Sequence, residues 1–320
     1  MGKASRTKQS DDRRGRIAQQ REAQRRAEQR KRIYLAGGAI LAVAIVVVAL
    51  VLVKLNTGNS GTPSAAAPTG AALTKVVNEV TSVPSSVSDE VADGGVSTGM
   101  FVSATTSSAI SSASSELGSY FATVDGTALT TGGKPEVLFM GGEYCPYCAA
   151  QRWAIVNALS RFGTFSNLKT THSSSTDTDP NTPTFTFYGA TYTSSYINFT
   201  SVEEYSNVAN GSGGYTTLQT PTAAQAAIGK AYDPQGYIPF LDVGNKYVEV
   251  GNLSPLSPTL LSGKSWATVA SALSDPTSTI GKAIIGNANY ETAAICQQTK
   301  NLPATACTPT IQKLESSLAS

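Results

Sequence analysis

The sequence predicts an α/β protein in which a central mixed sheet is flanked by helices, placed behind one N-terminal transmembrane helix. Three observations support this fold class. An uncharged apolar run at 33–53 is long enough to span a bilayer. A short apolar run at 137–140 is followed by a helical pattern at 149–162. An antiparallel strand pair at 238–250 is then followed by helical segments.

The apolar run Ile33–Val53 has 21 residues and contains neither a charged residue nor proline. As a helix it would be roughly 31 Å long, about the thickness of the hydrocarbon core of a bilayer. A buried helix of a globular domain would carry a polar stripe, which this run lacks. The alternative is a cleaved signal peptide, because the small residues Ala65–Ala67 could form a cleavage site. The basic segment before the run is, however, far longer than in signal peptides.

Charge is distributed unevenly on the two sides of this run. Residues 1–32 contain twelve Lys/Arg and four Asp/Glu, whereas residues 33–320 contain twelve and eighteen. The positive-inside rule therefore places the basic head in the cytoplasm and the rest of the chain outside. The head contains no aromatic residue and no known nucleic-acid-binding motif. We expect it to lie against lipid headgroups and to bind no nucleic acid.

A tether connects the span to the external part, because residues 54–72 are rich in Gly, Ser, Thr and Pro. The predicted parts of the chain are a basic cytoplasmic head (1–32), a transmembrane helix (33–53), a flexible linker (54–72), an N-terminal extension (73–132) and a main domain (133–320) with a β-rich insertion at about 168–232.

The secondary structure of the external part follows from periodicity and turn residues. Helical spacing of apolar residues predicts helices, and alternation of aromatic and β-branched residues predicts strands. Asp125–Gly126 and Gly189 indicate the turns of two hairpins. The predicted helices are 73–83, 107–117, 149–162, 222–232, 265–273, 279–299 and 310–318; the predicted strands are 137–140, 168–171, 238–243 and 246–250, with hairpins at 120–130 and 184–199.

The segment 134–163 carries the strongest signal of the main domain. Its residues 137–140 form a continuous apolar run, as in a strand that is buried on both faces, and two glycines at 141–142 end the run. Between 149 and 162, apolar residues recur every third position and give a helix one apolar stripe. Gly163 then stands where a helix C-terminus prefers glycine.

The motif Cys145-Pro146-Tyr147-Cys148 lies between this strand and this helix. The N-terminus of a helix favours a thiolate, and the thiolate is the form that attacks a disulfide. The two intervening residues place the second sulfur about one helical turn further on. We therefore expect Cys145 to be the exposed attacking sulfur and Cys148 the buried resolving sulfur.

Two other interpretations of the CxxC motif stay open. One is half of a zinc site that Cys296 and Cys307 would complete, although ten intervening residues are more than zinc sites use. The other is an inert disulfide. For Cys296 and Cys307 we expect a structural disulfide, with a second redox pair as the alternative. All four cysteines lie on the external side of the span, which fits an oxidising compartment.

The segment Lys134–Gly163 resembles the active-site strand and helix of the thioredoxin superfamily. Several features are similar to those of a prokaryotic single-span family catalogued as a thioredoxin-like domain of unknown function. These features are the basic head, the single span, the segments Glu143–Ala150 and Thr184–Tyr192, and the late cysteine pair. The resemblance implies a thioredoxin-like central sheet and a reaction that uses no cofactor and no metal.

Members of the superfamily carry a cis-proline at the start of a strand opposite the CxxC motif, where it pairs with substrate backbone. Pro239 is the matching position in this chain, and Ile238 precedes it. The resemblance thus implies that the residues that bind substrate are Pro146, Tyr147, Ile238 and Pro239.

Two features depart from the superfamily pattern. A buried acid usually stands six residues before the first cysteine, where this chain has Phe139, and the nearby Glu143 is expected at the exposed end of the strand. In addition, ninety-three residues separate Cys145 from Pro239, about twice the usual spacing, which predicts the β-rich insertion.

These observations predict a membrane-anchored, extracytoplasmic thiol–disulfide oxidoreductase that acts on secreted or surface proteins. Its expected partners are protein or peptide thiols and disulfides, a redox protein of the membrane, and the lipid bilayer around 33–53. The alternative is a non-catalytic binding or assembly module whose CxxC motif is structural. Oxidases, reductases and isomerases share this motif, and the direction depends on how strongly the fold stabilises the Cys145 thiolate.

Overall fold

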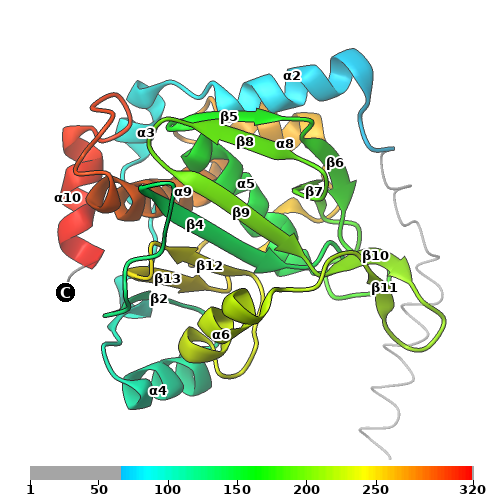
Figure 1. Ribbon diagram of the computed structural model, residues 1–320. Helices are drawn as coiled ribbons and strands as arrows, with labels where there is room; N and C mark the ends of the chain where they lie inside the picture. The colour runs from blue at the N-terminus through cyan, green and yellow to red at the C-terminus, as the bar shows by residue number, and fades with distance from the viewer. Residues whose placement is uncertain (1–65, 319–320) are drawn as a thin grey trace, which may run out of the picture. The chain divides into compact units, whose positions relative to one another are not determined.

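The computed structural model describes residues 66–318 (Figure 1). The predicted basic head, the predicted transmembrane helix at 33–53 and most of the predicted linker lie outside the described residues. Within 66–318, no helix combines the length and the apolar character that a membrane span requires.

A mixed sheet of seven strands forms the centre of the described part. Its order is β1-β2-β13-β12-β4-β3, and β9 also pairs with β4. The central strand β4 runs parallel to β9 and antiparallel to β12. The strands of this sheet are β1 (Phe101–Ser103), β2 (Tyr120–Thr123), β3 (Thr130–Thr131), β4 (Lys134–Gly141), β9 (Asn198–Glu203), β12 (Phe240–Val243) and β13 (Tyr247–Val250).

Helices cover both faces of the sheet, which confirms the predicted mixed sheet flanked by helices (Figure 1). Side chains of β4 alternate between two apolar cores: Phe139 packs beneath α5, whereas Leu138 and Met140 pack beneath α4 and α6. The strand is apolar from Val137 to Met140 because both of its sides are buried there. The helices are α2 (Gly70–Thr81), α3 (Ser85–Val91), α4 (Ser107–Leu117), α5 (Pro146–Ser160), α6 (Ala223–Tyr232), α7 (Pro258–Leu261), α8 (Trp266–Ala272), α9 (Thr279–Gln298) and α10 (Pro309–Leu318), with a 3-10 turn at Thr98–Met100.

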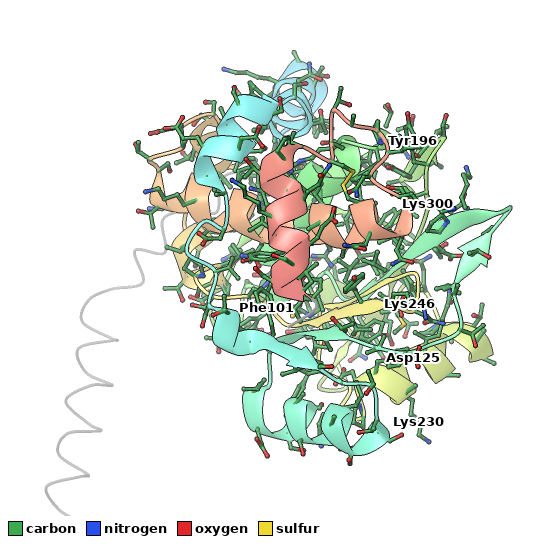
Figure 2. All side chains as sticks on the ribbon, turned by 90° about the vertical axis from the view of Figure 1, so that its left-hand side faces the viewer. Phe101, Asp125, Tyr196, Lys230, Lys246 and Lys300 are labelled. Carbon is green, nitrogen blue, oxygen red and sulfur yellow. A yellow bond between two sulfur atoms is a disulfide. The ribbon has the colours of Figure 1, made fainter. Side chains whose placement is uncertain are left out.

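The segment 120–130 does not form the predicted hairpin. Instead β2 pairs with β1 and β13, and β3 pairs with β4. Between these strands the chain runs along the β12–β13 turn, where the Gly126 N–H donates to the Asn245 carbonyl and Lys246 forms an ion pair with Asp125 at 3.6 Å (Figure 2). A Cβ atom at Gly126 would lie 2.8 Å from the Asn245 oxygen, so this glycine permits a close backbone approach and does not reverse the chain.

The predicted hairpin at 184–199 is also wrong. These residues belong to three strands with three different partners: β7 (Pro183–Thr186) pairs with β6, β8 (Thr191–Ser194) pairs with β5, and β9 pairs with β4. Alternation identifies a half-buried strand but does not identify the strand that pairs with it. The other short strands are β5 (Gly163–Ser166), β6 (Lys169–His172), β10 (Tyr205–Ala209) and β11 (Tyr215–Thr217).

The predicted N-terminal extension and the predicted insertion both contribute strands to the central sheet. The strands β1 and β2 come from the predicted extension, and β9 comes from the predicted insertion. The helix α2 begins at Gly70, inside the predicted linker. The remaining predicted helices and the pair β12–β13 are confirmed. Local signals explain this success: Thr106 caps α4 by accepting a hydrogen bond from the Ala109 N–H.

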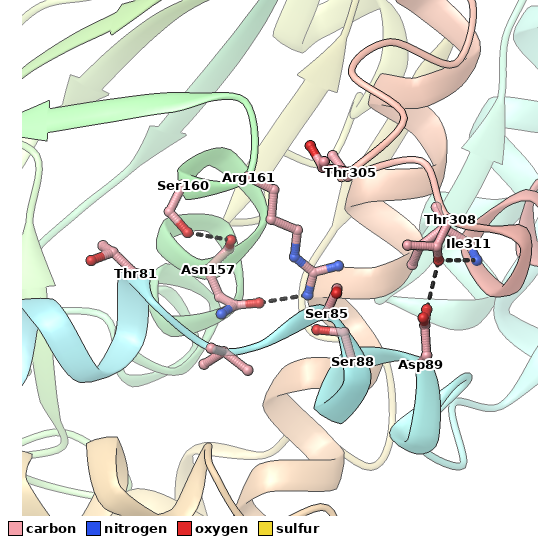
Figure 3. A pocket seen from close by; sticks show the side chains of 12 residues that line it. Thr81, Ser85, Ser88, Asp89, Asn157, Ser160, Arg161, Thr305, Thr308 and Ile311 are labelled. Atoms are coloured by element: carbon pink, nitrogen blue, oxygen red, sulfur yellow. Dashed lines mark hydrogen bonds between the residues drawn. The ribbon is translucent and has the colours of Figure 1, made fainter.

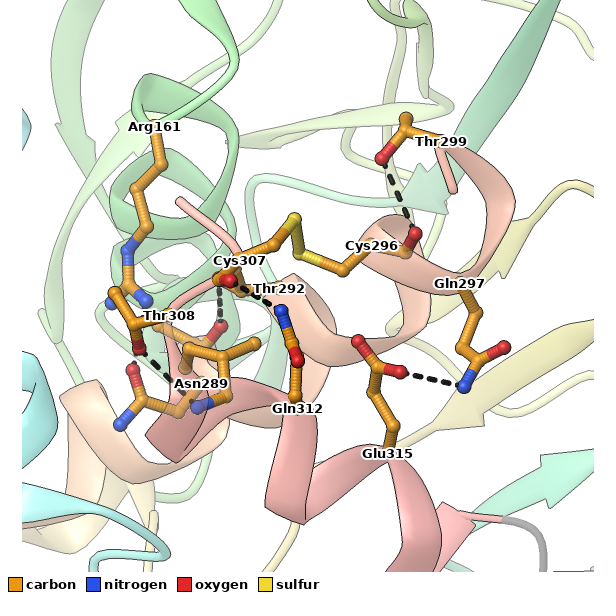
Figure 4. The surroundings of a disulfide bond; sticks show 12 residues. Arg161, Asn289, Thr292, Cys296, Gln297, Thr299, Cys307, Thr308, Gln312 and Glu315 are labelled. Atoms are coloured by element: carbon orange, nitrogen blue, oxygen red, sulfur yellow. Dashed lines mark hydrogen bonds between the residues drawn. A yellow bond between two sulfur atoms is a disulfide. The ribbon is translucent and has the colours of Figure 1, made fainter. Parts of the chain in front are cut away.

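A disulfide between Cys296 and Cys307 joins the end of α9 to the loop before α10 (Figure 4). Both cysteines are buried. Side chains of α10 continue the attachment, because Gln312 donates to the Cys307 carbonyl at 2.9 Å and Glu315 accepts from Gln297 at 2.7 Å. The bond closes a short loop and fastens the last helix to the core.

Replacing both disulfide cysteines by serine is expected to lower the free energy of unfolding by about 3 kcal/mol, because the unfolded chain gains the freedom that the loop closure removes. Chemical denaturation of Cys296→Ser/Cys307→Ser measures the loss. The wild-type protein unfolded with a reductant present is the control and should lose a similar amount. A change below about 1 kcal/mol in both would contradict a stabilising role.

A polar pocket of about 210 Å³ lies between α3, the end of α5 and the disulfide loop (Figure 3). Arg161 donates there to the side-chain oxygens of Asn157 and Asn289, at 2.6 and 2.8 Å. Burial lowers the pKa of Arg161 to about 10. Thr308 donates to Asp89 at 2.6 Å on the opposite wall. The Arg161–Asn289 contact joins the end of α5 to α9, and the Thr308–Asp89 contact joins the loop before α10 to α3.

Candidate active site

Cys145 is the N-cap residue of α5. It follows the end of β4 at Gly141 by four residues, after a turn that contains Gly142. Its backbone is extended, with φ −74° and ψ 122°, and its sulfur accepts a hydrogen bond from the Cys148 N–H at 3.3 Å. Pro146 suits the first helical position, where a backbone N–H would have no partner inside the helix. The helix start thus presents N–H groups and the positive end of the helix dipole to the Cys145 sulfur.

Gly141, the last residue of β4, allows the second sulfur to pack against the strand. A Cβ atom at this position would lie 3.0 Å from the Cys148 Sγ and 2.7 Å from the Phe139 ring. Any larger residue would therefore push the first turn of α5 away from the sheet.

Cys145 and Cys148 are free thiols in the structure. Cys148 is completely buried, as predicted for the resolving sulfur. Cys145 is 6% exposed, which is less than the sequence predicted for an attacking sulfur. The Cys145 N–H donates to the Gly142 carbonyl at 3.3 Å, and the Cys145 sulfur lies 3.8 Å from the Ile238 carbonyl oxygen in the loop before β12.

The environment separates the acidities of the two thiols. The pKa of Cys145 lies below its usual value, because the Cys148 thiol and then the Cys148 N–H donate hydrogen bonds to its thiolate. The pKa of Cys148 lies well above its usual value, because burial disfavours its charged form and the neighbouring Cys145 adds to this effect. The surroundings thus favour a thiolate at Cys145 and a protonated thiol at Cys148.

The structure brings the predicted residues Ile238 and Pro239 to the CxxC motif. The Cys145 thiol lies 3.8 Å from the Ile238 carbonyl oxygen, and the Ile238–Pro239 peptide bond is cis. Tyr147 is 46% exposed beside the motif, whereas Pro146 is buried at the start of α5. Ile238 thereby forms part of the surroundings of the Cys145 sulfur.

Tyr144, the residue before Cys145, connects the motif to the hairpin β10–β11. Its ring stacks on Tyr215 with centroids 4.3 Å apart and meets Tyr205 edge-on at 6.3 Å. The Glu143 N–H also donates to the Tyr205 carbonyl at 2.8 Å. The hairpin, which projects beyond the central sheet in Figure 1, is therefore tied to the turn that carries the cysteines.

A buried ion pair lies behind the motif. Arg152, one helical turn after Cys148, donates to both carboxylate oxygens of Glu203 on β9, at 2.8 and 2.6 Å. Both side chains are fully buried, and the guanidinium lies 5.5 Å from the centre of the Phe139 ring. The positive charge of Arg152 favours the thiolate forms of Cys145 and Cys148.

A second buried network lies on the neighbouring side of α5. The Gln151 amide donates to Glu249 of β13 at 2.8 Å and to Glu291 of α9 at 2.5 Å. Asn252 donates to the Gln151 oxygen at 2.8 Å and to the Tyr147 carbonyl at 3.1 Å. Two buried carboxyl groups are thus connected by hydrogen bonds to the backbone of the motif.

Glu249 lies two strands away from Phe139 in the sheet. Phe139 pairs with Leu241, and Leu241 pairs with Glu249, so these side chains share one face of the sheet. The sequence-based placement of Glu143 at an exposed strand end is wrong, because this residue is only 9% exposed.

Residues 120–226 match a family described as a domain of unknown function (DUF929). The match covers β4, the CxxC motif and α5, and it ends before Ile238 and the disulfide. The predicted resemblance to a family of unknown function is confirmed at this level. No curated protein and no solved structure matches the chain.

The pairing of the cysteines bears on the zinc interpretation. Cys296 and Cys307 are bonded to each other, so they cannot act as thiolate ligands beside Cys145 and Cys148. Within residues 66–318, no cluster of three or more His, Cys, Asp or Glu side chains has the geometry to hold a metal ion.

The two buried networks were not predicted from the sequence. One signal was available for the first: Arg152 follows Cys148 by four residues and therefore shares its face of the helix. Its partner Glu203 becomes evident only when the parallel register is known, in which Glu203 lies opposite Gly141. Likewise, Glu249 and Glu291 meet Gln151 through contacts between residues far apart in the sequence.

Proposed function

We propose that the protein is a membrane-anchored thiol–disulfide oxidoreductase of thioredoxin-like fold that acts on secreted or surface proteins outside the cytoplasm. One observation carries the proposal: the Cys145 sulfur caps α5, accepts the Cys148 N–H and lies 3.8 Å from the Ile238 carbonyl. A thiol with a lowered pKa stands in front of a buried thiol with a raised pKa, as sequential attack and resolution require.

The arrangement of strands supports the thioredoxin-like assignment. The antiparallel strand β12 begins at Phe240 opposite Met140, near the end of β4. Pro239 therefore lies where the CxxC turn begins, which is the relation that the resemblance implies for the substrate-binding proline. The helices on both faces and the position of the motif between β4 and α5 agree with it.

The proposed reaction exchanges one disulfide for another. When the protein holds a Cys145–Cys148 disulfide, a substrate thiolate attacks the Cys145 sulfur, and Cys148 leaves as a thiolate that takes up a proton. A second substrate thiolate then attacks the substrate sulfur in the mixed disulfide and releases the Cys145 thiolate. Two electrons pass from the substrate dithiol to the protein. Of the two protons that the substrate thiols release, one is taken up on Cys148 and the other stays in solvent while Cys145 remains a thiolate; the reverse sequence reduces a substrate disulfide.

Alkylation and substitution test this function. In the reduced full-length protein, iodoacetamide at neutral pH is expected to modify Cys145 and to leave Cys148 unmodified, because of the difference in exposure and acidity. Cys145→Ser should abolish exchange with a dithiol peptide, and Cys148→Ser should accumulate the mixed disulfide. Cys296→Ser/Cys307→Ser is the control and should retain exchange. Exchange that persists in Cys145→Ser would refute the proposal.

A further inference from the structure

A groove of about 390 Å³ opens beside the CxxC motif, on the face of the sheet that α6 covers. Its floor is apolar and consists of Met140 from β4 and Phe240 from β12. Gly229 of α6 and Ile238 line its sides. Ile238 is shared with the active site, since its carbonyl oxygen lies 3.8 Å from the Cys145 sulfur. The groove therefore begins next to the reacting atom.

Two carboxyl groups and one ammonium group line this apolar groove. Asp233 is buried and already accepts a hydrogen bond from the Ser114 hydroxyl at 3.2 Å, and burial raises its pKa to about 6. Lys230 is exposed at the rim. Glu204 is partly buried, and within residues 66–318 its carboxylate has neither an ion-pair partner nor a hydrogen-bond donor. Glu204 thus offers a charge that is not yet matched.

Glu204 lies at the end of the groove that is close to Cys145. Its backbone N–H donates to the Gly141 carbonyl at 2.8 Å, at the beginning of the turn that leads to the motif. Its charge also contributes to the raised pKa of Tyr144, after the larger effect of burial and the effects of the two active-site cysteines and Asp177. The unmatched carboxylate therefore acts on Tyr144, the residue that precedes Cys145.

We propose that this groove binds the side chain of a lysine or arginine that stands next to the reacting cysteine of a substrate peptide. The inference rests on the proposed function. Long cationic side chains combine an apolar stem, which fits on Met140 and Phe240, with a charged end that can reach Glu204. A neutral apolar side chain would cover Glu204 without giving it a partner, and an acidic side chain would be repelled.

Lys230 opposes this preference but does not cancel it. Its ammonium group is exposed, so solvent and salt screen its repulsion of a bound cation. Glu204 is partly withdrawn from water, and its attraction for a cation is screened less. The substrate class that the groove favours is a basic segment of a polypeptide around the cysteine.

Three peptides that differ only beside the cysteine test the preference. Each has the form acetyl-X-Cys-Gly-amide with X as lysine, norleucine or glutamate, and each cysteine is joined to thionitrobenzoate by a disulfide. The Cys145 thiolate of the reduced, full-length Cys148→Ser protein in detergent attacks the peptide sulfur and expels coloured thionitrobenzoate. We expect the lysine peptide to react about three- to tenfold faster than the norleucine peptide, and the glutamate peptide to react slowest.

Substitutions then locate the origin of the preference, each of them in the Cys148→Ser background. Glu204→Gln is expected to make the lysine and norleucine rates equal, because the groove then offers no charge to the lysine side chain. Glu90→Gln removes an equal charge from an exposed position on α3, away from the groove, and should preserve the ratio. Lys230→Gln should increase the ratio, and added salt should reduce it.

The outcomes separate this inference from the proposed function. If all three peptides react and Glu204→Gln leaves the lysine-to-norleucine ratio of rates unchanged, the groove does not bind a cationic side chain. The proposed thiol–disulfide exchange would still be supported. If none of the peptides releases thionitrobenzoate, the proposed function itself fails. A ratio that falls equally in Glu204→Gln and Glu90→Gln would show a general effect of net charge and would also overturn the inference.

Discussion

Arg152→Met is expected to lower the free energy of unfolding by about 3 to 5 kcal/mol. The substitution leaves Glu203, which is fully buried on β9, without the guanidinium that now donates to both of its oxygens. A carboxylate in this position cannot recover its hydration, so the native state must hold an unpaired charge or take up a proton. Because methionine fills a similar volume, the loss reports on charge and not on a cavity.

Chemical denaturation of the full-length protein measures this effect, and a double variant provides the control. Arg152→Met/Glu203→Leu removes both charges together and is expected to regain most of the lost stability, since a buried ion pair is often no better than an apolar pair of similar volume. A single variant that loses less than about 1 kcal/mol would contradict the argument. So would a double variant that is no more stable than the single one.

The sequence predicted those parts of the fold that depend on local signals. The segment β4–turn–α5 was predicted because a continuous apolar run, two glycines and one apolar stripe follow each other within thirty residues. The pair β12–β13 was predicted because Gly244–Asn245 provides a tight turn, in which both residues have positive φ. In each case the partner elements are neighbours in the sequence.

The failures concern partners that are distant in the sequence. The residues of β7, β8 and β9 alternate as strands do, and they are strands, but they pair with β6, β5 and β4 and not with one another. Likewise, Asp125–Gly126 has the composition of a hairpin turn, yet Gly126 is required for close contact with the β12–β13 turn. Composition determines local conformation here, and tertiary packing determines the pairing.

In the candidate site, too, the features that depend on local sequence were predicted and those that depend on distant partners were not. Cys145 and Cys148 follow from their spacing and from the helix that begins between them, whereas the buried polar residues around them do not. Gln151 and Arg152 are not part of the predicted apolar stripe, yet both residues are buried because nearly the whole of α5 is covered. A buried polar side chain needs a partner, and these partners lie on β9, β13 and α9.

Glu249→Gln is expected to make the protein more stable at neutral pH and to weaken the dependence of its stability on pH. Burial raises the pKa of Glu249 well above its ordinary value of 4.5, and burial together with the charge of Glu249 raises that of Glu291. Below pH 4.5 each carboxyl group is protonated in both states. As the pH rises above 4.5, the unfolded chain releases protons that the native state retains, so stability falls by about 1.4 kcal/mol per pH unit for each group.

Measuring the free energy of unfolding at pH 5 and pH 7 isolates this contribution. Asp233 and Asp242, whose pKa values burial raises to about 6 and about 7, add a decline of the same sign in every variant, so the comparison between variants is decisive. Glu249→Gln preserves the shape of the side chain and an acceptor for Gln151, and it should reduce the loss between these two pH values, by at most about 1.4 kcal/mol for each pH unit. Glu116→Gln, at an exposed position on α4, should leave the loss unchanged. An equal pH dependence in Glu249→Gln and wild type would mean that the buried carboxyl group is ionised at neutral pH, and the hydrogen bonds from Gln151 would then have to stabilise a charge in the core.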